Sequence, residues 1–135
     1  MSSIEETDKL KLDFSKLAGV AKTGAGVLPV AVQNTDGDVI LVAYTNEEAF
    51  RKALSTRRLV LWSTSRNELW EKGAASGNSF ELVEVYVNCE QNSLLYRVRP
   101  LGEGICHTKN RRGGARNCFY RRVNMDTLEL TNMDP

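Results

Sequence analysis

The residues best suited to chemistry in this chain are its three cysteines, Cys89, Cys106 and Cys118, and its only histidine, His107. Three thiolates leave one position of a zinc tetrahedron open for water, as in catalytic rather than structural zinc sites. No pair has the C-x-x-C spacing of a zinc ribbon or a thioredoxin-like redox site. The alternative is that the cysteines are buried thiols that pack as small hydrophobic side chains. The cysteines alone leave both interpretations open.

A second segment of unusual composition runs from Ser65 to Asn78. It follows neither the period of a strand nor that of a helix, and it combines Arg66, Trp70 and Lys72 with glycine, serine and asparagine. Arginine and lysine bind phosphate groups well, and glycines let backbone N–H groups approach an anion closely. The segment is therefore either a phosphate-binding loop or a solvated loop that Trp70 anchors.

Length and composition predict one globular domain. The chain has 135 residues, enough to bury a core without disulfides. Its 18 Lys and Arg balance 17 Asp and Glu, so the overall charge gives no reason to expect a nucleic-acid partner. The longest apolar runs, 27–32 and 39–44, are too short to span a membrane. An odd cysteine count and no secretory leader predict a cytoplasmic protein without a membrane partner.

The elements that must position these residues begin with a hairpin. Two β-branched runs, 27–33 and 39–44, flank an Asp-Gly turn at Asp36-Gly37, which is typical of a β-hairpin. A helix should follow, because Thr45 can cap it while Glu48 reaches back as in a capping box. Apolar residues then recur along one helical face, and Arg57 and Arg58 suit the negative C-terminal end.

The remaining elements are mostly strands. They are expected at 59–63, at 80–88, after a turn at 90–92 again at 93–99, and finally at 119–123. In the 80–88 strand, Val83, Val85 and Val87 are expected on one face and Glu84 on the other. One main helix among hairpin-connected strands predicts an α+β fold, mainly antiparallel. A polar lead-in (1–26), a folded domain (27–125) and a C-terminal tail (126–135) are expected.

Taken in order, several motifs closely resemble the phosphoribosyl-AMP cyclohydrolase family of histidine biosynthesis. The resemblance covers roughly Leu28 to Arg122, and its strength lies in the combination and spacing of the motifs. They are Tyr44-x-Asn46-x-Glu48-Ala49, Ser65-Arg66-x-x-Leu69-Trp70-x-Lys72-Gly73-x-x-Ser76-Gly77-Asn78, Cys89, Cys106-His107-Thr108 and Cys118-Phe119-Tyr120-Arg121. The length matches the cyclohydrolase alone, without the pyrophosphohydrolase domain fused to it in some organisms.

The resemblance implies a metalloenzyme acting on a small nucleotide. Cys89, Cys106 and Cys118 would be zinc ligands, in a site shared between the two chains of a homodimer. The loop residues expected to bind the substrate are Arg66, Trp70, Lys72, Ser76, Gly77 and Asn78. The reaction would open the N1–C6 bond of the substrate's adenine ring with zinc-activated water, as zinc deaminases attack C6 of adenine.

His107 is the expected catalytic residue, because it adjoins a proposed ligand and can move protons near neutral pH. The alternative is that His107 only orients the metal ligands.

The chain departs from the family pattern in two places. Where the family commonly has Asp-Cys-Asp-x-Asp, assigned to Mg²⁺, this chain has Asn88-Cys89-Glu90-Gln91-Asn92. Mg²⁺ prefers anionic oxygen ligands, so Asn88, Glu90 and Asn92 should bind it weakly. The segment 109–117 is also longer than usual and basic. It either wraps a substrate phosphate or is a solvated loop.

Two other functions compete with the cyclohydrolase. The loss of two carboxylates favours a lapsed enzyme whose zinc site only stabilises a dimeric binding protein. A related purine aminohydrolase with a changed substrate is the other alternative. The retained Arg66, Trp70, Lys72 and His107 argue against the first, and the intact 65–78 segment argues against the second.

Overall fold

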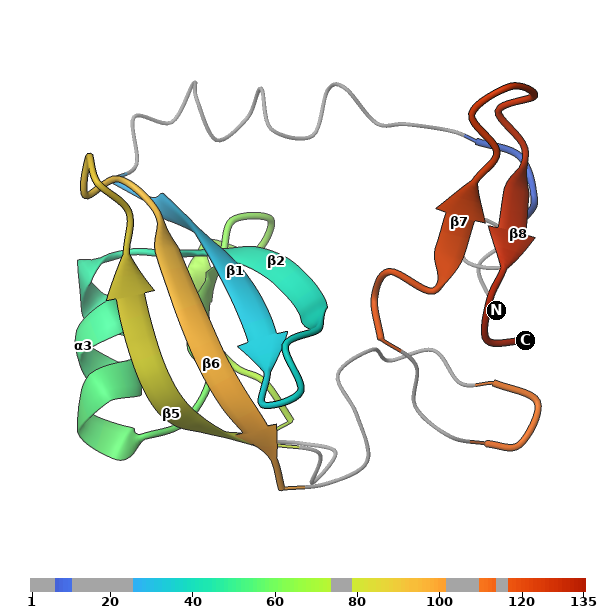
Figure 1. Ribbon diagram of the computed structural model, residues 1–135. Helices are drawn as coiled ribbons and strands as arrows, with labels where there is room; N and C mark the ends of the chain where they lie inside the picture. The colour runs from blue at the N-terminus through green and yellow to red at the C-terminus, as the bar shows by residue number, and fades with distance from the viewer. Residues whose placement is uncertain (1–6, 11–25, 74–78, 102–109, 114–116) are drawn as a thin grey trace.

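The computed structural model describes residues 7–10, 26–73, 79–101, 110–113 and 117–135. Within them, a six-stranded sheet carries one helix, and a two-stranded ribbon lies near the C-terminus (Figure 1). The elements of the sheet layer are β1 (Leu28–Asn34), β2 (Val39–Thr45), α3 (Glu47–Thr56), β3 (Val60–Ser63), β4 (Glu68–Glu71), β5 (Phe80–Val87) and β6 (Leu94–Pro100). The ribbon consists of β7 (Arg121–Val123) and β8 (Leu130–Asn132).

The strand order of the sheet is β4-β3-β2-β1-β6-β5. All neighbouring strands are antiparallel except β1 and β6, which run parallel with Val30 opposite Leu94. The predicted α+β fold with mainly antiparallel strands is therefore confirmed. The parallel pair brings the β5–β6 hairpin beside the β1–β2 hairpin, although the two are far apart in the sequence.

The first hairpin forms as its sequence predicts. Gly37 has φ +94°, a conformation that glycine adopts without a steric penalty. The Asn34 side-chain oxygen accepts hydrogen bonds from the backbone N–H groups of Asp36 and Asp38, at 3.0 and 2.9 Å. These bonds satisfy the turn locally and fix the register of β1 against β2.

The start of α3 differs from the prediction. Asn46, not Thr45, is the N-cap, and its Oδ1 accepts a hydrogen bond from the Ala49 N–H at 2.9 Å. Thr45 is buried as the last residue of β2, so the residue expected to cap the helix belongs to the strand instead. Glu48 is consequently one position too early for a capping box. At the other end, Arg57 donates to the Leu54 carbonyl at 2.6 Å, as expected for a cation there.

Two strand predictions also need correction. The 65–78 segment contains the strand β4, which pairs with β3 through Leu61 and Trp70. In β5, a bulge between Leu82 and Glu84 shifts the alternation of side chains. Val83, the extra residue at the bulge, is therefore exposed, whereas Val85 and Val87 stay on one face, opposite the buried Tyr96 and Leu94. Val87 is nevertheless exposed, because it ends the strand. A single inserted residue reverses which face the following side chains occupy.

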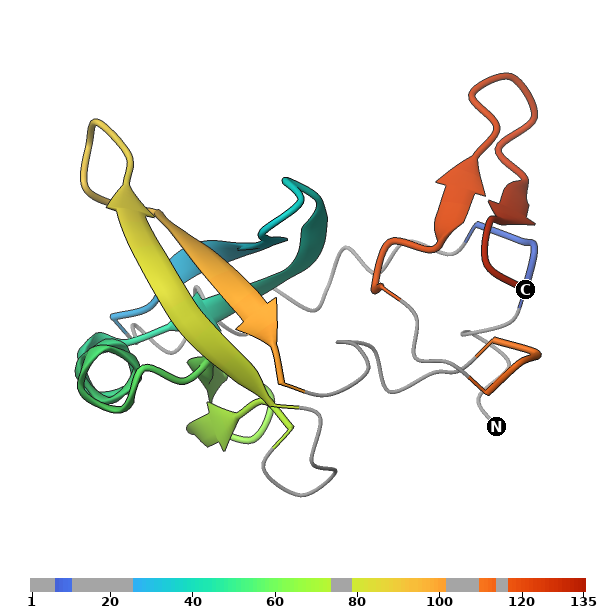
Figure 2. The same cartoon turned by 60° about the horizontal axis from the view of Figure 1, so that its bottom comes forward.

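The core lies between the helix and one face of the sheet, as Figure 2 shows with α3 nearly end-on. Ala49 and Ala53 are fully buried on the helix, and such small side chains let it lie close to the sheet. The large apolar side chains that bury most completely lie in the strands or, for Leu59, just before β3, and they are Val30, Val32, Leu59, Val60, Leu61, Tyr96 and Val98. No helix in the described part of the chain is long and apolar enough to cross a membrane.

The C-terminal ribbon extends the predicted last strand. That strand is confirmed in a shorter form as β7, and it pairs with β8, which lies within the segment expected to be a tail. Near the start of the ribbon, the Cys118 N–H donates to the Ile40 carbonyl of β2 at 3.2 Å. Several large apolar side chains stay exposed here, namely Phe119, Val123, Met125, Leu128 and Met133.

Candidate functional site

Two of the three cysteines lie in the described residues, and both are exposed. Cys89 occupies the β5–β6 turn, and Cys118 precedes β7 beside the strand β2. Cys106 and His107 lie outside the described residues. Among the residues that are described, no group of three or more His, Cys, Asp or Glu side chains could hold a metal ion. The cysteine arrangement expected from the sequence therefore stays a prediction.

The β5–β6 turn holds all three residues predicted to bind magnesium. The Asn88 Oδ1 accepts hydrogen bonds from the backbone N–H groups of Asn92 and Ser93, both at 2.9 Å. The Asn88 amide donates to the Asn92 Oδ1 at 2.7 Å, and the Asn92 amide donates to Glu90 at 3.2 Å. The structure thus brings the three side chains together, but their hydrogen bonds serve the turn itself.

The predicted phosphate-binding loop is partly described. Lys72 places its Nζ 5.5 Å from the centroid of the Trp70 ring, within the range of a cation–π contact. Trp70 packs against the core from β4, as its anchoring role predicts. Arg66 is exposed, with its Nε 3.6 Å from Glu68. Ser76, Gly77 and Asn78 lie outside the described residues.

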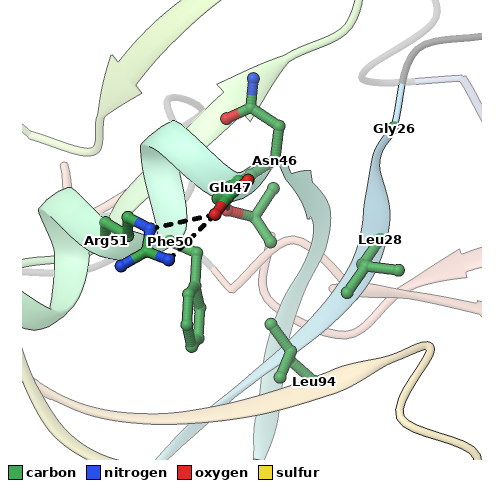
Figure 3. A pocket seen from close by; sticks show the side chains of 8 residues that line it. Gly26, Leu28, Asn46, Glu47, Phe50, Arg51 and Leu94 are labelled. Carbon is green, nitrogen blue, oxygen red and sulfur yellow. Dashed lines mark hydrogen bonds and ion pairs between the residues drawn. The ribbon is translucent and has the colours of Figure 1, made fainter.

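A cavity of about 370 Å³ opens between the start of α3 and the first residues of β1 and β6. Leu28, Phe50 and Leu94 point toward it from three different elements (Figure 3). Its rim is polar and includes Glu47 and Arg51, which form an ion pair at 2.9 Å. The remaining lining residues are Gly26, Thr45 and Asn46.

A second, more polar cavity of about 530 Å³ adjoins the first. The two share Gly26, Asn46, Glu47 and Arg51. The second continues to Trp62 and to Asn67, the neighbour of Arg66. Sequence reasoning did not assign these lining residues a binding role. Asn46 belongs to one of the family-like motifs, but its sequence context indicates only the start of a helix.

The sheet face away from α3 carries an apolar row across four strands. Val42 on β2 faces Ala31 on β1, Ala31 pairs with Leu95 on β6, and Leu95 pairs with Tyr86 on β5. Val42 and Tyr86 are 52% and 48% exposed. These four residues are called the outer row below.

An ionic network flanks the outer row. Glu84 accepts a hydrogen bond from the Tyr86 hydroxyl at 2.5 Å and another from Arg97 at 2.9 Å. The Tyr86 hydrogen bond, followed by that of Arg97, lowers the pKa of Glu84 below its ordinary value. The carboxylate is therefore held in its charged form beside an apolar surface.

Comparison with known proteins matches most of this chain to one family. The family model described as phosphoribosyl-AMP cyclohydrolase matches residues 41–120. A phosphoribosyl-AMP cyclohydrolase of Halobacterium salinarum is 41% identical over 98% of this chain and 97% of its own length. That of Desulfatibacillum aliphaticivorans is 38% identical over 90% of this chain and 88% of its own.

A longer relative matches only in part. The histidine biosynthesis bifunctional protein HisIE of Thermus thermophilus is 42% identical over 79% of this chain, which corresponds to 48% of that protein. The similarity thus concerns about half of the bifunctional protein.

Proposed function

Because the chain belongs to the phosphoribosyl-AMP cyclohydrolase family, we propose that it opens the adenine ring of phosphoribosyl-AMP in histidine biosynthesis. Water adds to C6, and the N1–C6 bond breaks. The oxygen of water becomes the carbonyl oxygen of a carboxamide, while N1 keeps the electron pair and takes a proton. The observation that carries this proposal is the 41% identity to the Halobacterium enzyme over nearly the whole of both chains.

We propose Cys89, Cys106 and Cys118 as the ligands of a zinc ion. The donor set fits, because three thiolates suit zinc and leave room for water. The exposure of Cys89 and Cys118 supports this, since both are accessible to a metal. Bound zinc would lower the pKa of its water toward neutrality and so supply hydroxide for the attack at C6.

The positions of Cys89 and Cys118 favour a site shared by two chains. Cys89 lies two residues beyond Val87, which pairs with Leu94. Cys118 is hydrogen-bonded to Ile40 of β2, and β2 lies two strands away from β6. Ile40 also lies toward the end of the strands opposite to the Cys89 turn. At about 3.3 Å per residue along a strand and about 4.8 Å between strands, the two lie on the order of 15 Å apart. Sulfurs that each lie about 2.3 Å from one zinc cannot be so distant.

The outer row supplies a surface for the second chain. Its four residues are contiguous across β2, β1, β6 and the edge strand β5, and Cys89 and Cys118 lie beyond its two flanks. A two-fold axis through the middle of this face would bring Cys89 of one chain toward the partner's Cys118, and the reverse, giving two equivalent sites. The proposed assembly is therefore a homodimer with two shared zinc sites.

The other predicted residues receive roles that follow from their chemistry. His107 adjoins a proposed ligand and would carry the proton that N1 takes up when the ring opens. Arg66 and Lys72 would hold substrate phosphates, and the Trp70 ring fixes where the Lys72 ammonium lies. Ser76, Gly77 and Asn78 would complete this loop with hydrogen-bond donors.

A second metal has weaker support. Only Glu90 among the predicted magnesium ligands carries a charge, and the oxygens of Asn88 and Asn92 accept hydrogen bonds within the turn. We propose that magnesium binds here weakly.

The test of the function is turnover of phosphoribosyl-AMP by the purified protein, followed through the ultraviolet change that accompanies ring opening. Release of ammonia without that change would indicate a purine aminohydrolase. A zinc-loaded protein without either reaction would indicate a lapsed enzyme. A His107→Asn variant that loads zinc but turns over slowly would support the proton-transfer role.

A further inference from the structure

We propose that the cavity between α3, β1 and β6 binds the ribonucleoside part of the substrate, and that Glu47 accepts a hydrogen bond from a ribose hydroxyl there. The inference rests on the proposed function, because that function supplies a nucleotide. It adds a ribose-binding residue and a base-binding pocket, neither of which belongs to the predicted loop or to the metal ligands.

The size and lining of the cavity suit a nucleoside. Its volume of about 370 Å³ falls at the lower end of the range for small-molecule sites, roughly 300–1,000 Å³. Leu28, Phe50 and Leu94 converge on it from a strand, a helix and a second strand (Figure 3). An apolar floor with one aromatic ring suits the flat face of a heteroaromatic base.

The rim offers one acceptor that the protein leaves available. Arg51 donates from both Nε and Nη2 to the same Glu47 oxygen, Oε1, at 3.2 and 2.9 Å. The other oxygen, Oε2, accepts no hydrogen bond from the described residues. An ionised carboxylate accepts at both oxygens and donates at neither, so it selects a donor such as a ribose hydroxyl. Arg51 pairs with the Glu47 side chain, which is 78% exposed and so accessible to a ligand.

The neighbouring cavity explains how a substrate with two phosphoribosyl arms could fit. It shares the Glu47 and Arg51 rim and continues to Asn67, beside Arg66 of the proposed phosphate loop. On its other side, the first cavity is lined by Leu94, the first residue of β6, which directly follows the turn that contains Cys89. The first cavity therefore lies between the residues proposed to bind phosphate and a residue proposed to bind zinc.

Calorimetric titration with adenosine 5′-monophosphate, and with its 2′,3′-dideoxy form, tests the ribose contact. Wild-type protein should prefer the ribose form by about tenfold, as expected for a hydrogen bond to a charged group. Glu47→Gln should reduce that preference to within about threefold, because a neutral amide forms a weaker bond. Asp36→Asn is the matched control, since it removes one exposed carboxylate at the far end of the β1–β2 hairpin and should keep the preference.

Filling the cavity tests the base pocket. Leu28→Phe should raise the KM for phosphoribosyl-AMP at least tenfold, while zinc content stays at the wild-type level. Val83→Phe adds the same ring at an exposed bulge and should leave KM unchanged. Leu28→Ala enlarges the pocket and should weaken binding less than Leu28→Phe does. Thermal unfolding of each variant verifies that it is folded before its KM is compared.

The outcomes separate this inference from the proposed function. An active wild-type protein whose Glu47→Gln and folded Leu28→Phe variants bind and turn over normally would overturn the cavity assignment alone. A protein that binds the ribose form selectively through Glu47, but turns over no phosphoribosyl-AMP, would support the cavity and reject the proposed function. A wild-type protein that binds neither the substrate nor either adenylate would overturn both.

Discussion

Asn88 and Asn92 are hydrogen-bonded to each other across the β5–β6 turn, with the Asn88 Nδ2 2.7 Å from the Asn92 Oδ1. The Asn88 oxygen is engaged as well, by two backbone N–H groups. The amides thus stabilise the turn at positions where the resembled family commonly carries carboxylates. For Asn88 to bind a metal, its oxygen would have to give up one of the two hydrogen bonds that hold the turn together.

Replacing both amides by carboxylates should tighten magnesium binding at this turn. The Asn88→Asp, Asn92→Asp double variant adds two negative charges beside Glu90, and Coulomb attraction for a divalent cation rises accordingly. Calorimetry should show magnesium binding tightened by at least about tenfold. Asn34→Asp is a close control, because the Asn34 oxygen also accepts two backbone N–H bonds in a turn. No gain in the double variant would mean that this turn is not a metal site.

Among single variants of the turn, Glu90→Gln should lower the rate in the ring-opening assay more than Asn88→Ala or Asn92→Ala, because Glu90 is the one carboxylate among the three residues.

Zinc should be present at about one ion per protomer, because three thiolates and a water complete a tetrahedron. Cys106→Ser should lose most of the zinc and most of the activity, measured by elemental analysis and by the ring-opening assay. Wild-type protein stripped by a chelator and then reloaded with zinc is the control for irreversible damage. Full turnover by a metal-free preparation would contradict the zinc proposal.

Mixing two inactive variants should restore activity if the zinc site is shared. Cys89→Ser and Cys118→Ser each lack one ligand. A mixed dimer of the two contains one site with both cysteines intact and one site with neither. Random re-association should therefore recover about a quarter of wild-type sites, because half of the dimers are mixed and each has one intact site. An active, zinc-loaded monomer in light scattering would refute the shared site.

Glu84 should stabilise the folded state in a pH-dependent way. Its pKa is lowered in the folded protein, first by the Tyr86 hydrogen bond and then by Arg97. Its contribution is therefore fully present above the ordinary value of 4.5, and it is lost as the pH falls through the lower folded-state pKa. Glu84→Gln should unfold at a lower denaturant concentration than wild type at pH 7, and the difference should shrink at acid pH. A difference independent of pH would contradict this assignment.

Lys72 should contribute to substrate binding through its charge. Lys72→Met keeps most of the stem over Trp70 but removes the ammonium, so KM should rise roughly tenfold or more, as for a lost charge-assisted hydrogen bond. Lys72→Arg should retain part of the affinity. Lys52→Met removes an exposed lysine from α3 and should leave KM unchanged. Equal KM values for Lys72→Met and Lys52→Met would exclude Lys72 from the site.

The fold was largely predictable from local signals, and its corrections come from contacts that sequence patterns do not encode. The Asp36-Gly37 turn and the β-branched runs determine the first hairpin, because each acts within a few residues. The β5 bulge at Leu82 and Glu84 was not predictable, since it depends on how β5 pairs with β6. The N-cap of α3 is Asn46 and not the predicted Thr45, because Thr45 pairs with β1 as the last residue of β2.

The site was predictable only where residue type carries the chemistry. Cysteine, histidine, arginine and lysine are conspicuous in a sequence, so they were identified as candidates. Leu28, Phe50 and Leu94 look like ordinary core residues, and only the tertiary arrangement shows that they border a cavity. The separation of Cys89 and Cys118 likewise needed the strand register.

The parallel pairing of β1 with β6 has a consequence for how the chain acquires its structure. The β1–β2 hairpin can form as soon as its own residues leave the ribosome, but β1 remains an open edge until β6 has been synthesised. Closing that edge joins segments with a large sequence separation, and such steps carry a high loop-closure entropy and slow folding. During this interval the exposed backbone of β1 is a template for pairing with other chains. The vulnerable stage of biogenesis should therefore end when β6 docks.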